Sequence, residues 1–449
     1  MSILLAAKSG VAAGDPYAVA LVFAGFVVCV AIAALSYQRE RAYSASVIYL
    51  ALGIAAGAVL HLLGGERIDP IADAELVGRI AEGALLVAVF TAGLRVERTL
   101  FSGQWRSVVI LIALVMPACV ALIALFGTQV MGLSLGAALV LGAVLAPTDP
   151  VLAGDIGVGA PGDQADHPEE ARFAISAEAG LNDGLAAPFV LFGLVVAAGF
   201  ASEDVLEWAL ADVLLAIPVG VLVGALGGYG LAALVHTGRE RGMLDTQFNG
   251  FVAIAAPLLL YGVAEALGGI GFVAGFVGGL GFRRYEFGHE YNRELHDGAE
   301  VFEKLLELAV ILVLGSTVTL AALGEPGVAG WLLAPLLLLV IRPAAVFACF
   351  APMRALGMRS RLFLAWFGVR GVAALYFCTL AVQTGVLSPS EEGTVVWTAL
   401  VCVMVSILVH GITSGPLGRK LDEEVTPAWK TAEESETPPS TEPGIAGRL

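Results

Sequence analysis

The chain has 449 residues, of which 58% are hydrophobic and 14% are charged, and its formal net charge is −16. Soluble globular proteins are nearer half apolar and a quarter charged, so this composition predicts a protein embedded in lipid rather than a large soluble core. The acidic total argues against nucleic acid as a partner, because surfaces that bind nucleic acid are basic. The five cysteines lie in apolar segments without metal-ligand spacing, so we interpret them as small buried hydrophobic residues.

Long apolar runs follow one another along almost the whole chain. A transmembrane helix needs about 20 mostly apolar residues. Runs of about this size predict about 13 transmembrane helices, at 17–37, 43–64, 79–95, 107–127, 131–154, 174–200, 207–235, 247–267, 268–282, 301–323, 329–352, 362–386 and 392–415. The 55 glycines fit this prediction, because small residues let helices approach closely in a membrane. We therefore expect an all-α polytopic membrane protein.

The loops between these runs alternate in charge. If the N-terminus lies outside, the inner loops hold nearly all of the Lys and Arg residues that lie in loops, and the outer loops hold little beyond Lys8 and Arg67. Because cytoplasmic loops are enriched in Lys and Arg, the alternation predicts a cytoplasmic C-terminus. We expect the first apolar run to be a retained helix. Residues 422–449 are rich in Glu, Pro, Thr and Ser, which predicts a disordered cytoplasmic tail after a transmembrane domain at 1–421.

Several charged residues lie within the apolar runs. A charge at the bilayer centre costs roughly 2.5–3.5 kcal/mol on insertion scales, so such residues are candidates for function. They are Asp149, Glu178, Asp183, Glu265, Arg342 and Arg370. Glu265 lies near a helix end, which favours an interfacial role. Glu303 and Glu307 are interpreted as acids of the first turn or vestibule of the tenth helix.

Two runs contain sequence breaks. Pro147 and Pro150 flank Asp149, and each proline removes a backbone donor and disfavours helix before it. Unwound backbone in a membrane is tolerated only where it is buried in protein or lines a cavity, and in transporters its carbonyls bind coupling ions. Gly368-Val369-Arg370-Gly371 predicts a second break. The two breaks fall at matching places in helices four to six and in the last three helices, which indicates an inverted repeat.

The sixth run carries an oxygen-rich cluster. Glu178 and Asn182 are four residues apart and share a helix face, and Asp183 is about 100° further round. Carboxylate and amide oxygens suit hard cations. A carboxylate in a low-dielectric site binds a proton more readily than in water, and a nearby arginine such as Arg342 or Arg370 opposes this. A proton and a cation that exclude each other on one carboxylate are sufficient for obligatory exchange.

These motifs, taken in order, resemble the CPA1 family of sodium/proton antiporters, the NhaP and NHE group. The resemblance rests on Thr148-Asp149-Pro150, on Glu178-x-x-x-Asn182-Asp183-Gly184, on Arg342-Pro343, on Gly368-x-Arg370-Gly371 and on the glycine-rich stretch 271–280, and it covers about residues 17–420. It implies a core domain at about 107–200 and 329–415 and a dimerisation or scaffold domain at about 17–95 and 207–323. Helices five and twelve would be unwound and would cross at mid-membrane. The family also implies a homodimer with elevator-type alternating access, here in a prokaryotic plasma membrane.

The resemblance also implies residue roles. Asp183 would bind cation or proton, with Glu178, Thr148 and Asn182 completing the site and the cation held at Asp183, Glu178 and Thr148. Glu178 would pair with Arg342, and Asp149 would pair with Arg370. Asn182 stands where a related electrogenic family carries a second Asp, which implies electroneutral one-for-one exchange. No catalytic residue and no cofactor are expected.

One departure from the family pattern leaves the ion open. Ala179 stands where family members often carry a Ser that can add a hydroxyl ligand. One oxygen is therefore missing from the expected set of ligands. Na⁺ is the first expected cation, and Li⁺ and K⁺ remain open.

Three other functions are alternatives to antiport. A passive cation channel would also place acids in a pore, and a transporter of another substrate could share the fold. An intramembrane aspartyl protease would use two membrane aspartates, but its Gly-x-Gly-Asp pattern is absent around Asp183. The sequence therefore predicts a transporter rather than an enzyme.

Overall fold

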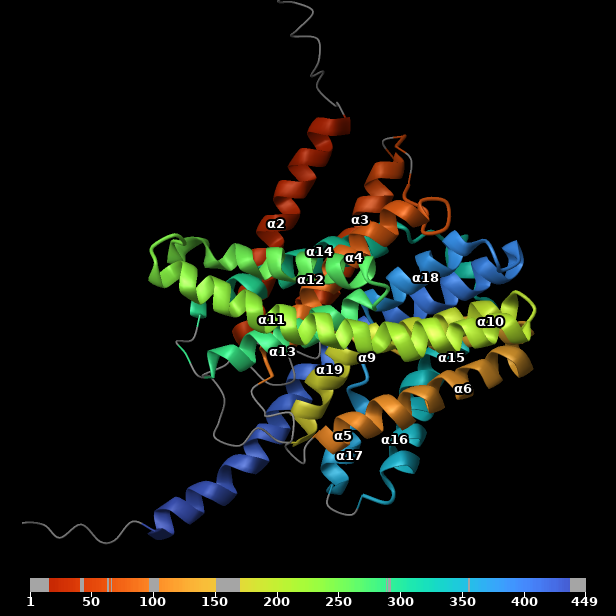
Figure 1. Cartoon of the computed structure of the whole chain (residues 1–449). Helices are drawn as coiled ribbons and strands as arrows, with labels where there is room; N and C mark the ends of the chain where they lie inside the picture. Colours follow the sequence, from red (N-terminus) through yellow and green to blue (C-terminus); the bar gives the residue numbers. More distant parts are fainter. Residues whose placement is uncertain are drawn as a thin grey trace, which may run out of the picture.

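Figure 1 shows the computed structural model of the chain. The structure describes residues 16–40, 44–62, 64–65, 67–96, 105–150, 170–287, 289, 292–353 and 356–436. Within these ranges the regular structure is entirely helical. This bears out the expected all-α class for the part of the chain that is described.

The helices follow in chain order. The first group is α2 (Pro16–Glu40), α3 (Ala45–Leu62), α4 (Ala74–Leu94), α5 (Trp105–Ile110), η1 (Leu111–Val115), α6 (Met116–Phe126), η2 (Gly127–Met131) and α7 (Leu135–Val144). The middle group is α9 (Glu170–Ala197), α10 (Ser202–Glu207), η3 (Trp208–Leu215), α11 (Ala216–Glu240), η4 (Thr246–Phe251), α12 (Val252–Ala266), α13 (Gly271–Glu286) and α14 (Arg293–Ser316). The last group is η5 (Ala322–Gly324), α15 (Gly327–Leu336), η6 (Leu337–Ile341), α16 (Arg342–Phe350), α17 (Met358–Trp366), α18 (Val372–Thr384) and α19 (Pro389–Glu436).

Many of these helices have the length and hydropathy of membrane spans. In the described residues, 8 candidate spans are found: Ala45–Leu62, Ala74–Leu94, Trp105–Met131, Glu170–Ala197, Ser202–Glu240, Gln247–Ala266, Gly327–Phe350 and Pro389–Ser414. They coincide with predicted apolar runs. The other predicted runs fall on α2, α7, α13, α14 and the pair α17 and α18. The number of about 13 crossings stays a prediction.

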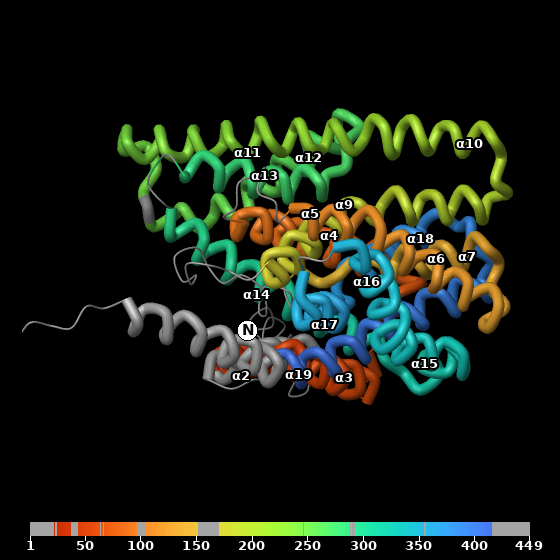
Figure 2. The backbone as a smooth tube through the Cα atoms, turned by 90° about the horizontal axis from the view of Figure 1, so that it is seen from below, coloured from red at the N-terminus to blue at the C-terminus, as the bar shows by residue number. Residues whose placement is uncertain are grey.

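The helices form layers (Figure 2). The consecutive helices α10, η3 and α11 make one long rod on one face, α3 and α19 lie on the opposite face, and α4, α9 and α13 lie between them. α11 packs on α13, α13 packs on α4, and α4 in turn contacts α9, α14 and α18. α9, which carries the candidate acids, is therefore central.

Glycines allow the closest of these contacts. A Cβ added at Gly228 of α11 would overlap the carbonyl oxygen of Gly278 on α13. A Cβ at Gly279 of α13 would likewise overlap the carbonyl oxygen of Phe90 on α4. The glycines of α13 therefore serve close helix packing, as expected for small residues in a membrane protein.

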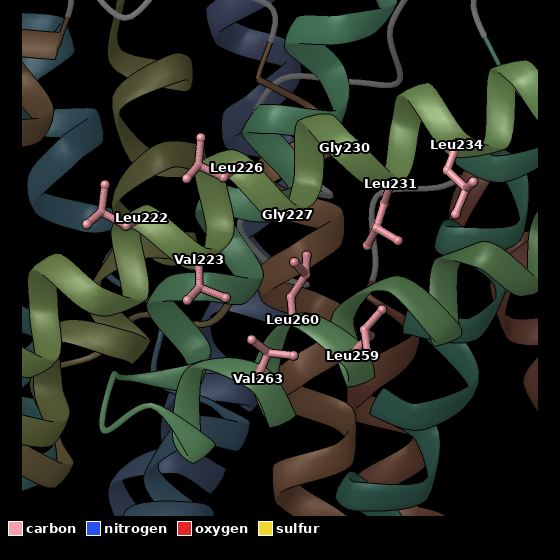
Figure 3. A pocket seen from close by; sticks show the side chains of 10 residues that line it. All are labelled: Leu222, Val223, Leu226, Gly227, Gly230, Leu231, Leu234, Leu259, Leu260 and Val263. Atoms are coloured by element: carbon pink, nitrogen blue, oxygen red, sulfur yellow. The ribbon is translucent and has the colours of Figure 1, made fainter.

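The outer face of the long rod is apolar. Leu226 is 73% exposed and Leu234 is 65% exposed. A groove of about 480 Å³ runs between α11 and α12, as Figure 3 shows, and its lining is formed by Leu222, Val223, Leu226, Gly227, Gly230, Leu231, Leu234, Leu259, Leu260 and Val263. Such a large apolar surface suits a lipid environment rather than water.

Two boundary predictions differ from the structure. α14 begins at Arg293, so Glu303 and Glu307 lie in the middle of the helix and not in its first turn. The polar first turns of α14 carry no hydrophobic run that could mark the start from sequence. α19 continues to Glu436, so 422–436 is helical where a disordered tail was predicted; its Glu, Lys and Ala residues are good helix formers. Residues 437–449 lie outside the described part.

Candidate functional site

Two non-helical segments meet in the interior of the molecule. The first break follows α7, and residues 145–149 there are not helical. The second break, residues 367–371, separates α17 from α18. The backbone N–H of Asp149 donates to the carbonyl oxygen of Val369 at 2.8 Å. The two sequence breaks therefore lie side by side and satisfy some of each other's backbone groups, as buried polar backbone requires.

Arg370 crosses from the second break to the first. Its Nη1 donates to the carbonyl oxygen of Pro147 at 3.0 Å and also to that of Ala146. Arg370 is 1% exposed. The guanidinium group of Arg370 in the second break thus donates hydrogen bonds to carbonyls that the proline-rich first break leaves without helical partners.

The predicted ion pair between Asp149 and Arg370 is not formed. The Nε and Nη2 of Arg370 have no hydrogen-bond partner among the described residues. The Asp149 carboxylate instead lies against Gly371, where an added Cβ would overlap Oδ2. Gly371 is the N-cap of α18, so the carboxylate lies at the positive end of that helix dipole. Arg370 instead donates to the carbonyl oxygens that the first break releases, at Ala146 and Pro147.

This contact gives a prediction for Gly371. Gly371→Ala is expected to lower the free energy of unfolding by about 1–3 kcal/mol and to impair transport, because the new methyl would displace the Asp149 carboxylate. The backbone φ of −152° is open to alanine, so the effect is steric. Thermal unfolding in detergent measures it. Gly262→Ala is the matched control, since a Cβ there meets nothing within 4 Å; equal stability of the two variants would contradict the contact.

α9 carries the first of the predicted pairs. Glu178 Oε1 accepts from Arg342 Nη1 at 2.6 Å, and Glu178 Oε2 accepts from Arg342 Nη2 at 2.7 Å. Arg342 Nη2 also donates to the carbonyl oxygen of Leu364 at 3.3 Å. Both side chains are almost completely buried. The bidentate pair therefore ties α9 to the start of α16 and to α17, and both Glu178 oxygens are already engaged.

Thr148 and Asn182 join the first break to α9. Asn182 Nδ2 donates to Thr148 Oγ1 at 2.8 Å, and both residues are buried. One helical position further, Asp183 is 0% exposed. The predicted site residues Thr148, Asn182 and Asp183 therefore share one buried region, with Glu178 one turn away on α9.

Three oxygens of this region lack hydrogen-bond donors. Among the described residues, Asp183 Oδ1, Asp183 Oδ2 and Asn182 Oδ1 are buried without a hydrogen-bond partner. Buried polar atoms are nearly always satisfied, so such a group requires an explanation. Carboxylate and amide oxygens are ligands for hard cations, and a carboxylate can also take up a proton. The arrangement can therefore hold either a cation or a proton.

Close packing surrounds Asp183. A Cβ at Gly180 would overlap the ring of Phe276 on α13, and a Cβ at Gly184 would lie 2.8 Å from the backbone nitrogen of Val273. Ala92 of α4 also lies beside Gly180. Asp183 is therefore placed where α9, from the expected core, meets α4 and α13, from the expected scaffold.

Two acids of α14 lie close to the first break. A cavity of about 10 Å³, close to the room that one water needs, is lined by Ala84, Leu85, Ala88, Asp149, Pro150, Glu303, Glu307 and Val372. Glu303 accepts from Arg95 at 3.1 Å and 2.5 Å, and Glu307 accepts from Ser46 Oγ at 2.5 Å. Glu303 and Glu307 therefore line the same cavity as Asp149. The sequence does not predict this, because hydropathy misplaces the start of α14.

Two further buried polar residues contact the second break from α19. Ser406 Oγ accepts from the backbone N–H of Arg370 at 2.8 Å, and His410 lies one turn later. No motif predicts a role for either residue. Their spacing of four in the otherwise apolar stretch 399–411 is the signal that could have identified them.

Comparisons with known proteins place these features in a family. The model of the family described as "Sodium/hydrogen exchanger, transmembrane" matches residues 18–420. The Na(+)/H(+) antiporter 2 of Zygosaccharomyces rouxii is 27% identical over 385 residues, which are 79% of this chain and 47% of that protein. The K(+)/H(+) antiporter NhaP2 of Shewanella oneidensis is 25% identical over 262 residues, which are 58% of this chain and 44% of that protein. The chain spans about half the length of these curated relatives.

A solved structure shares the fold. The sodium proton antiporter MjNhaP1 from Methanocaldococcus jannaschii at pH 8 matches with a TM-score of 0.67 and 15% sequence identity. The match covers 88% of this chain and 100% of that chain. At this identity the likeness concerns the arrangement of the helices, which is that of an antiporter fold.

Proposed function

The chain belongs to the sodium/hydrogen exchanger transmembrane family, and from this we propose that it exchanges a monovalent cation for a proton across a membrane. The observation that carries the proposal is the group of three buried oxygens without donors on Asp183 and Asn182. Relatives named as Na⁺/H⁺ and K⁺/H⁺ antiporters support it. The cation and the proton are substrates, and the proposed exchange needs no cofactor.

Asp183 is the proposed carrier of both substrates. Its carboxylate takes either a proton or a cation, because one negative charge in a buried site is neutralised by either of them. Thr148 and Asn182 supply further oxygens beside it. Glu178 is the proposed second ligand through its remaining lone pairs, although both of its oxygens accept from Arg342. The cation or the proton must then leave the Asp183 carboxylate before the other can bind there.

The charges around Asp183 favour electroneutral exchange. Glu178 is balanced by Arg342, and Asp149 lies at the N-terminus of α18. Asn182 next to Asp183 is neutral. One carboxylate therefore exchanges one cation for one proton, so we propose a stoichiometry of one to one.

The proposed movement displaces a core domain against a scaffold. The core comprises about 107–200 and 329–415, and the scaffold about 17–95 and 207–323. The hydrogen bonds between the two breaks lie within this core, which supports its movement as a unit, while Asp183 lies at its boundary with α4 and α13. Elevator-type alternating access would then carry Asp183 from one side to the other. A homodimer assembled through the scaffold is part of this proposal.

The two ends of the molecule differ in charge. The C-terminal ends of α11 and α13 lie at one end with the end of α19 and carry Arg239, Arg241, Arg283 and Arg284 (Figure 1). The opposite end holds α10 with Glu203 and Asp204. Because Lys and Arg gather on the cytoplasmic side, we propose a cytoplasmic C-terminus and an outside N-terminus. A prokaryotic plasma membrane is the proposed location.

Ala179 gives a test of the ion site. Ala179→Ser is expected to lower the half-saturating concentration of Na⁺ or Li⁺ roughly 2- to 10-fold, because one added oxygen contact contributes about 0.5–1.5 kcal/mol. Ala179 is 0% exposed and lies one turn before Asp183 on the same face. Ala177→Ser is the matched control, since Ala177 is equally buried on α9 but turned away. Identical transport kinetics in the two variants would contradict this position for the cation.

The proposed function itself is tested in proteoliposomes. A pH gradient is imposed, and Na⁺, Li⁺ and K⁺ are added separately under a voltage clamp. Collapse of the gradient by one or more cations, insensitive to voltage, is the expected result and names the ion. A cation flux that does not move protons would indicate a passive channel. No response to any cation, in protein shown to be folded, would indicate another substrate.

A further inference from the structure

α19 contacts both ends of the second break. The break begins after Trp366, the last residue of α17, and includes Arg370. Ser406 and His410 of α19 face it and are almost completely buried. Such buried polar side chains in an apolar stretch of a helix need hydrogen-bond partners.

The partners form one continuous chain. His410 Nε2 lies 2.9 Å from the carbonyl oxygen of Trp366, and His410 Nδ1 lies 3.1 Å from Ser406 Oγ. Ser406 Oγ accepts from the backbone N–H of Arg370 at 2.8 Å. The carbonyl and the amide at the two ends of the break are therefore linked through two side chains of α19.

The chemistry fixes the direction of each bond. The Trp366 carbonyl can only accept, so His410 Nε2 carries the hydrogen. In the neutral ring Nδ1 then accepts from the Ser406 hydroxyl, whose oxygen remains free to accept from Arg370. Nδ1 also lies 3.0 Å from the carbonyl oxygen of Ser406, to which it could donate only as an imidazolium. A protonated ring would add a positive charge near Arg370, and the neutral ring satisfies the whole chain without it.

This chain of hydrogen bonds continues to the proposed cation site. The guanidinium of Arg370 donates to the carbonyls of Ala146 and Pro147, immediately before Thr148. Thr148 Oγ1 then accepts from Asn182, the neighbour of Asp183. A displacement of the Arg370 backbone would therefore move the first break and the oxygens beside Asp183.

We propose that Ser406 and His410 are positioning residues that hold the second break in place and, through Arg370, set the geometry of the Thr148 and Asn182 oxygens. Neither residue touches the transported ion. Their effect on transport rests on the proposed exchange function, whereas their effect on the breaks does not.

The test compares removal with conservative replacement. Ser406→Ala and His410→Ala are expected to raise the half-saturating cation concentration of the folded protein about 10-fold. Ser406→Thr keeps a hydroxyl, and His410→Gln keeps a donor for the Trp366 carbonyl, so each is expected to recover most of the loss. Thr398→Ala is the control, because Thr398 is a buried hydroxyl of α19 without a hydrogen-bond partner among the described residues.

A second measurement does not depend on transport. Amide hydrogen exchange read by mass spectrometry is expected to rise at 367–371 and at 145–149 in both alanine variants, and not in Thr398→Ala. If hydrogen exchange rises while the wild type transports no cation, the proposed function fails and the positioning role stands. Unchanged exchange at both breaks, or an unchanged half-saturating concentration in folded alanine variants of a transporting protein, would overturn the proposal.

Discussion

Replacement of Asp183 by Asn is expected to abolish exchange and to leave a folded protein in the membrane. Asn has nearly the same shape as Asp but neither accepts a proton near neutral pH nor offers a negative charge to a cation. Asp183 has no hydrogen-bond partner among the described residues, so the substitution breaks no hydrogen bond to them. We therefore expect at least a 100-fold loss of cation-driven proton flux, a ~2.7 kcal/mol equivalent, with thermal stability unchanged or slightly higher.

The matched control is Asp212→Asn. Asp212 lies in η3 on the rod formed with α11, is partly exposed, and carries the same kind of side chain within a candidate span. Its replacement is expected to leave the rate and the half-saturating concentration unchanged. Both variants are assayed in proteoliposomes at equal density, with folding checked by size-exclusion chromatography. Residual exchange in Asp183→Asn would show that another carboxylate, with Glu178 as the first candidate, carries the coupling.

The parts of this site that could be predicted are those that the local sequence determines. Proline on both sides of Asp149 breaks a helix whatever its surroundings, and a charge inside an apolar run is visible without a structure. The resemblance to a known family then paired Glu178 with Arg342, and this contact is present. What these predictions share is dependence on a single residue type or on one short motif.

The failures depend on tertiary contacts. Arg370 donates to the carbonyl oxygens of Ala146 and Pro147, more than 200 residues earlier in the chain, and no local motif predicts this contact. The start of α14 is polar, so hydropathy cannot locate it and places Glu303 and Glu307 in the wrong turn. His410 gains its role only because α19 packs against a break in another helix.

The second large effect is expected at the Glu178 and Arg342 pair. Removal of either partner alone, by Glu178→Ala or Arg342→Ala, leaves a buried charge without compensation. Breaking such a pair typically costs about 3–5 kcal/mol. We therefore expect a clear fall in thermal stability and in the yield of folded protein for both single variants. Arg79→Ala is the control, because its partner Glu82 forms a pair in which the arginine side chain is 72% exposed, and exposed pairs contribute about 0–1 kcal/mol.

A double replacement separates stability from function at this pair. Glu178→Leu combined with Arg342→Met removes both charges and fills a similar volume, and buried pairs replaced in this way are often neutral or more stable. Stability is therefore expected to recover toward wild type. Transport is not expected to recover, because a Cβ at Gly368 would lie 2.6 Å from Arg342 Nε, so Arg342 packs directly on the second break. Full recovery of both properties would reduce the pair to a structural contact, and normal stability of the single variants would contradict the pairing itself.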